Sequence, residues 1–187
     1  MTVLVTIDHP WSGSFNYAIL QAVLHGLETA GHTADVLDLQ AEQFNPVLST
    51  AELEVYHGGK YLDPKIGEYQ RRVEAANHLV FIFPVWWETM PARLKGWFDR
   101  VFLPDWAFGE ADARPLLTHI RSGAAVTTMG APRPIHTSVE AALLRGTLEF
   151  CGVQRTRWFN ICEVGVVSAE ARQAFLQQVE EYARSLE

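Results

Sequence analysis

One stretch of the chain, residues 81–101, joins a buried strand, an aromatic turn and a helix in direct succession. Its first residues, Phe81-Ile82-Phe83, are typical of a strand that is buried on both faces, and a proline ends the run. Two adjacent tryptophans, Trp86 and Trp87, follow, and an amphipathic helix begins after Pro91. Parallel sheets bind ligands in the loops at the carboxyl ends of their strands. This stretch therefore predicts one wall of a ligand site at such an edge.

The rest of the chain alternates strand patterns with helix patterns. Short apolar or β-branched runs predict five strands, and apolar residues at helical spacing predict helices between them. This alternation predicts a doubly wound α/β fold around a five-stranded parallel sheet. If the strand order is 2-1-3-4-5, the loops after the first, third and fourth strands converge at one edge. The predicted strands cover residues 3–7, 34–39, 78–83, 124–128 and 156–161.

Residues 40–64 show no clear period, although they carry aromatic and turn residues. Long loops without secondary structure are usually functional or disordered. The aromatics favour an ordered loop, within residues 44–64, that covers a site or reaches a partner subunit. We find no internal repeat, low-complexity tract or linker, and 187 residues with 48% hydrophobic content suit one domain, residues 1–187.

Composition excludes several classes of partner. A net charge of −7 argues against nucleic-acid binding, which needs a basic face, and the scattered Lys and Arg argue against an anionic membrane surface. No run approaches the roughly 18 apolar residues of a membrane span, and we see no signal peptide, so we expect a cytoplasmic protein without membrane insertion. Cys151 and Cys162 are expected to be buried, reduced thiols. The histidines lack metal-ligand spacing, so no metal site is expected.

Two loops offer ligand chemistry, and each has a purely structural alternative. Ser12, Gly13 and Ser14 would face an anion, together with the free N–H groups of the helix start that follows, although an ordinary capped loop has the same composition. The tryptophan pair suits stacking on a planar heterocycle, and a pair that fills the core is the alternative. Asp8 and Glu88 could form a carboxylate pair at the same rim; a solvated capping Asp and a surface Glu are the simpler interpretation.

In their order and spacing, these motifs resemble one family over nearly the whole chain: the flavodoxin-like NAD(P)H:quinone oxidoreductases. This group includes quinone reductases, drug-activity modulators and the ancillary flavoproteins of potassium efflux systems. The matching segments are His9-Pro10 with residues 12–16, Phe44-Asn45-Pro46, residues 74–76, residues 83–87, Pro91-Ala92 with residues 94–102, Thr127-Thr128 and residues 150–152.

The resemblance implies a flavin site and a reaction. The flavin would accept hydride from NAD(P)H, and an acceptor would then occupy the same space, giving ping-pong, two-electron reduction of quinones. FAD is slightly favoured over FMN, because the 44–64 loop could cover an adenine. The phosphate end is assigned to His9, Ser14, Phe15 and Asn16, the ring to the backbone of Pro84, Val85, Trp86 and Trp87, and the pyrimidine end to Thr127, Thr128 and Gly130.

The chain also departs from the family pattern. Glu88 replaces an aromatic, Met129 interrupts a Thr-Thr-Gly-Gly motif, and His136 is the only nearby candidate for a catalytic side chain, with an exposed loop histidine as the alternative. The resemblance further implies a homodimer with the site across its interface. An accessory flavoprotein that regulates a membrane transporter, such as a potassium efflux system, remains an alternative function. A flavodoxin-type electron carrier ranks last, because its Thr-rich phosphate loop is absent.

Overall fold

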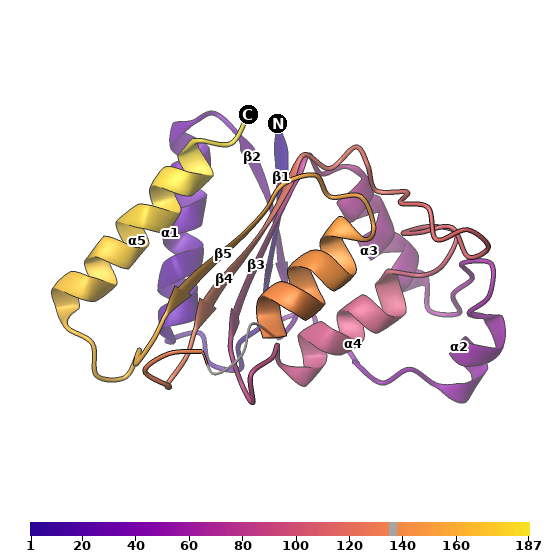
Figure 1. Cartoon of the computed structure of the whole chain (residues 1–187), viewed down its shortest axis with the longest axis horizontal. Coiled ribbons are helices and arrows are strands. Elements are labelled where there is room, and N and C mark those ends of the chain that lie inside the picture. The colour runs from indigo at the N-terminus through magenta and orange to yellow at the C-terminus, as the bar shows by residue number, and fades with distance from the viewer. Residues whose placement is uncertain (135–137) are drawn as a thin grey trace.

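The computed structural model describes residues 1–134 and 138–187, which fold around a five-stranded sheet (Figure 1). All strand pairs are parallel and the order is β2-β1-β3-β4-β5, which confirms the predicted doubly wound topology. The strands are β1 (Thr2–Ile7), β2 (Thr33–Asp38), β3 (His78–Pro84), β4 (Ser122–Thr128) and β5 (Thr156–Ile161).

Helices cover both faces of the sheet and make three layers (Figure 1). Helices α1 (Phe15–Thr29) and α5 (Ala169–Arg184) pack on one face. The other face carries α3 (Pro64–Glu74), α4 (Ala92–Val101) and η1 (Val139–Glu149), which is a π-helix.

The central strand β3 is apolar along its length because its side chains alternate between two hydrophobic cores. Leu79, Phe81 and Phe83 point into the core under α3, α4 and η1, and each is fully buried. Val80 and Ile82 point into the core under α1 and α5. A strand that is covered on both faces needs apolar residues at every position.

The prediction of an irregular segment at 40–64 was wrong in part. Residues Thr50–Val55 form a short helix, α2, whose start is fixed by a capping box between Ser49 and Glu52. The segment then packs on α4 through Arg100, which forms an ion pair of 2.5 Å with Glu52 and donates a 2.6 Å hydrogen bond to the Asn45 carbonyl. Six residues are too few to display a helical period.

In the described part of the chain, no helix is both long and apolar enough to cross a membrane.

Candidate functional site

The loops after β1, β3 and β4 begin side by side at one edge of the sheet. Asp8 donates its backbone N–H to Ile82 (3.1 Å), and Val85 donates its own to Thr128 (2.7 Å), so adjacent strands stay joined where the loops start. A cavity of about 400 Å³ opens at this edge. Small-molecule sites usually measure roughly 300–1,000 Å³, so the cavity is large enough for a cofactor-sized ligand.

The loops after β1, β3 and β4, the segment before α5 and the first turn of α5 form this cavity together. The residues that line it are His9, Trp11, Gly13, Ser14, Phe15, Asn16, Pro84, Val85, Thr128, Met129, Gly130, Val164 and Arg172.

One end of the cavity suits an anion. Ser14 is the N-cap of α1, but its hydroxyl makes no capping hydrogen bond. The Ser14 hydroxyl, the Asn16 Oδ1 and the Arg172 Nε are all buried without a hydrogen-bond partner in the described part of the chain. Buried polar groups are rarely left unsatisfied, so these three atoms indicate a missing polar ligand. The positive end of the α1 dipole and the Arg172 charge favour an anionic one.

The other end of the cavity is bounded by a tight turn after β3. Trp86 and Thr89 exchange two backbone hydrogen bonds of 3.0 and 3.2 Å. The two residues that they enclose, Trp87 and Glu88, have φ angles of +50° and +65°. Trp87 stands at the tip of this turn and is 98% exposed. A smaller cavity of about 220 Å³ adjoins the first and is lined by Val85, Trp87, Glu88, Met129, Gly130 and Ala131.

Asp8 fixes the first loop against α4. Its side chain is only 4% exposed and accepts a 3.0 Å hydrogen bond from the Leu94 backbone N–H in the first turn of α4. Burial raises the pKa of the Asp8 carboxyl, although this hydrogen bond and the nearby Arg93 charge act against the rise. The expectation of a solvated Asp8 was therefore wrong: the residue is a buried brace between two rim elements.

No cluster of three or more metal-binding side chains occurs among residues 1–134 and 138–187. A sequence profile of the flavodoxin-like fold family matches residues 1–186. The chain belongs to this family.

Similar proteins within the flavodoxin-like family are quinone oxidoreductases. NAD(P)H dehydrogenase [quinone] 1 of Cavia porcellus is 33% identical over 81% of this chain, but the match covers only 64% of that protein. The enzyme of the same name from Rattus norvegicus is 28% identical over 98% of this chain and 76% of its own length. A solved NAD(P)H:quinone oxidoreductase from Methanothermobacter marburgensis superposes with a TM-score of 0.89, at 28% identity, over 98% of this chain and 96% of that one. The predicted family resemblance is confirmed.

The cavity of about 400 Å³ brings together most of the residues that the sequence assigned to the flavin site. Eight of them line it directly: His9, Ser14, Phe15, Asn16, Pro84, Val85, Thr128 and Gly130. Trp87 lines the adjoining smaller cavity. Trp86 packs its ring 6.3 Å from that of His9, at the rim.

Thr127 and His136 differ from the rest. The Thr127 side chain points along the sheet, where it donates a 2.7 Å hydrogen bond to Asn160 and accepts one of 2.8 Å from the Trp158 indole. Asn16, by contrast, donates to Thr128 (3.1 Å), which ties the first turn of α1 to the end of β4. His136 lies outside the described residues.

Arg172 is the main site residue that the sequence did not reveal. It lies in the first turn of α5, where it lines the cavity and donates a 2.8 Å hydrogen bond to the Val164 carbonyl. In sequence it is one of several charged residues on an amphipathic helix, and nothing in that pattern distinguishes it. Gly13, which the sequence placed in the anion-binding loop, lines the cavity too. Trp11, Met129 and Val164 also line it without having been assigned to it.

Proposed function

We propose that this chain is an NAD(P)H-dependent flavin oxidoreductase that passes two electrons to a quinone or a similar acceptor. The observation that carries the proposal is a cavity at the carboxyl edge of the sheet, at whose anion-binding end buried atoms of Ser14, Asn16 and Arg172 have no hydrogen-bond partner among the described residues. A flavin carries a phosphate and a planar ring, and these match the two ends of the cavity. The names of the similar quinone oxidoreductases support the same activity.

The two ends of the cavity would have separate tasks. Ser14, Asn16 and Arg172 would bind the flavin phosphate and adjacent polyol, together with the free N–H groups at the start of α1. The backbone of residues 84–87 would hold the ring. Gly130 borders both cavities, and no atom lies within 4 Å of the position that its missing Cβ would take, so this wall is open to a ring. When bound, the flavin supplies the hydride and electron chemistry.

Side chains at the mouth would select the substrates. Trp86 and His9 form an aromatic rim at one side, and Trp87 and Glu88 stand at the tip of the turn beside the smaller cavity. We therefore propose that Glu88 contributes to the choice of acceptor.

For the cofactor we propose FMN rather than FAD. The expectation of FAD depended on residues 44–64 covering an adenine. Within one chain, this segment packs against α4 through Asn45 and Glu52, and none of its described residues lines the cavity. FAD would need cover from a second subunit. Chromatography of the chromophore released from the purified protein decides between the two, and FAD as the sole product would contradict this proposal.

A homodimer also remains a proposal. Trp87, which is 98% exposed, lies at the mouth of the site, and an aromatic side chain in that position would be covered by a second subunit. Nothing in the described residues or the relatives favours the alternative of a transporter accessory protein.

Steady-state kinetics test the proposed reaction. With NADH or NADPH varied at several fixed quinone concentrations, a single site used in turn by donor and acceptor predicts parallel double-reciprocal lines. Intersecting lines would show that both substrates bind together. Absence of turnover in flavin-loaded protein with either nicotinamide would contradict the enzymatic function.

A further inference from the structure

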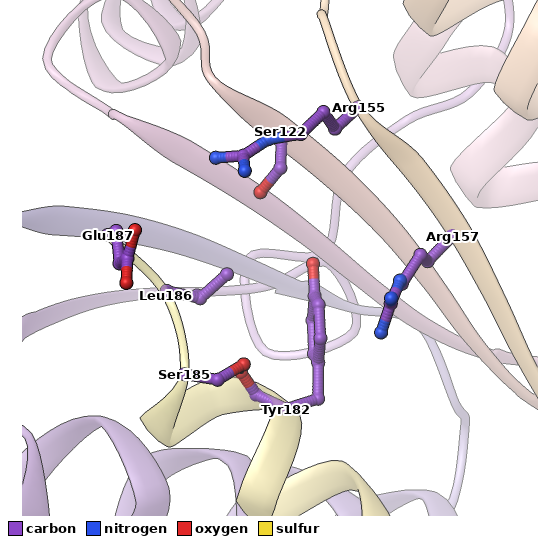
Figure 2. A pocket seen from close by; sticks show the side chains of 7 residues that line it. All are labelled: Ser122, Arg155, Arg157, Tyr182, Ser185, Leu186 and Glu187. Carbon is purple, nitrogen blue, oxygen red and sulfur yellow. The ribbon is translucent and has the colours of Figure 1, made fainter.

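A second cavity lies at the opposite edge of the sheet, where β4 and β5 begin and α5 ends (Figure 2). Its volume is about 180 Å³. Strands rise about 3.3 Å per residue, so the length of β4 separates this cavity from the candidate flavin site by roughly 20 Å. The two sites are therefore distinct. The second cavity is lined by Ser122, Arg155, Arg157, Tyr182, Ser185, Leu186 and Glu187.

Two arginines supply positive charge to this cavity. Arg155 directly precedes β5 and Arg157 is its second residue, so their side chains lie on the same side of the extended chain. Figure 2 shows both approaching from the β5 side. Neither guanidinium has an ion pair or a side-chain hydrogen bond with any residue that the structure describes. Both therefore keep their donors available for a ligand.

Neutral hydroxyl groups complete the cavity. Tyr182 stands up from α5 toward β4, and its ring packs 4.9 Å from that of Phe159 (Figure 2). Burial raises the pKa of the Tyr182 phenol, against the lowering effects of a Ser122 hydrogen bond and of the two arginine charges, so the phenol stays protonated at neutral pH. Ser122 is 5% exposed, and its hydroxyl is held 2.7 Å from the His78 Nδ1. These hydroxyls are fixed before any ligand arrives.

We propose that this cavity binds a small, doubly charged oxyanion: inorganic phosphate or the phosphoryl group of a phosphate monoester. Guanidinium pairs and hydroxyl donors are the groups that recognise phosphate oxygens. The cavity is smaller than the roughly 300 Å³ at which sites for larger ligands begin, so a whole dinucleotide does not fit. The Glu187 side chain places a carboxylate opposite the arginines (Figure 2), and this carboxylate opposes the binding of an anion.

Amide resonances locate the binding. In a ¹⁵N NMR titration at constant ionic strength, inorganic phosphate is expected to shift the amides of Ser122, Gly123 and Ser185 in a saturable manner. The amides of Ser14 and Asn16 report separately on phosphate in the candidate flavin cavity. A parallel titration with glycerol phosphate distinguishes the two sources: tighter binding of the ester assigns the site to phosphate monoesters, and equal or weaker binding assigns it to the free ion.

Variants test whether the arginines carry the binding. Arg155→Gln with Arg157→Gln is expected to weaken phosphate binding at Ser122 at least tenfold, since each charge-assisted hydrogen bond contributes about that factor or more. Arg114→Gln, an exposed arginine elsewhere, is the matched control and is expected to leave binding unchanged. Tyr182→Phe removes one hydroxyl and is expected to weaken binding several-fold. If the double variant does not fold, as its NMR dispersion would reveal, Arg155→Gln alone serves.

Glu187→Gln gives a change of opposite sign, because it removes the opposing carboxylate and is expected to tighten binding several-fold. Two results would overturn the proposal. One is the absence of saturable shifts at Ser122 and Gly123 up to tens of millimolar phosphate, and the other is equal affinity in the wild-type protein and the double arginine variant.

Discussion

Arg172 is the residue through which α5 contributes charge to the candidate flavin site. Its Nε is buried without a partner, and a flavin phosphate would supply one. Replacing it in Arg172→Gln is expected to weaken flavin binding about tenfold or more, the usual cost of losing one charge-assisted hydrogen bond. A fluorescence titration measures this. Arg184→Gln removes an exposed arginine at the other end of the same helix and is expected to bind flavin normally; equal affinities in the two variants would remove Arg172 from the site.

His78 makes stability depend on pH. It is fully buried, and burial, followed by the charge of Arg121, lowers its pKa to about 4. The unfolded chain has the ordinary histidine pKa of about 6.5, so it binds more protons than the folded protein between these values. The stabilisation is therefore complete above about pH 6.5 and is lost as pH falls to about 4, by roughly 3 kcal/mol.

Urea unfolding of a variant isolates this contribution. His78→Gln is expected to flatten the dependence of the unfolding free energy on pH between about 7 and 4, relative to the wild-type protein. His119→Gln, at an exposed position, is expected to keep the wild-type slope. A His78→Gln profile parallel to that of the wild type would show that another group titrates in this range.

At the scale of single elements, the turn after β3 holds two ordinary residues in a conformation that favours Asn and Gly. Trp87 and Glu88 both have positive φ, as in the two-residue turns that usually carry Asn-Gly. Trp87→Asn is therefore expected to raise the unfolding free energy by about 1 kcal/mol. The same variant is expected to lower quinone turnover, because the Trp87 side chain borders the ring cavity. Lower stability in urea would show that the Trp87 backbone is not strained.

One buried ion pair helps to fix segment 44–64 to its own chain. Arg100 is 6% exposed, and Glu52 supplies its main counter-charge, with Asp63 at 3.2 Å as a second. Glu52→Gln is expected to destabilise the protein by about 2 kcal/mol, less than for an isolated buried pair because Asp63 remains. Glu54→Gln on the same helix is exposed and is expected to change stability by less than about 0.5 kcal/mol. Equal values for the two variants would mean that the ion pair does not hold the segment.

At the scale of the whole molecule, two features were predictable from the sequence: the sheet topology and the edge of the sheet at which the cavity lies. Both follow from the alternation of strand and helix patterns along the whole chain, because the strand order decides which loops converge. Contacts between distant elements were not predictable. Arg172 reaches the cavity only because α5 packs beside α1, and its helix pattern is that of any solvent-facing arginine. Thr127 and Thr128 look alike in sequence, yet alternation along β4 turns one to Trp158 and the other to Asn16.

The single domain over residues 1–187 stays a prediction, which one cooperative unfolding transition would support.

The most direct test of the account is anaerobic reduction of the flavin-loaded protein. Addition of NADH or NADPH is expected to bleach the visible absorbance of the bound flavin, and a quinone added afterwards is expected to restore it. A protein that takes up neither FMN nor FAD would contradict the assignment of the cavity. A bound flavin that neither nicotinamide bleaches would contradict the proposed reaction.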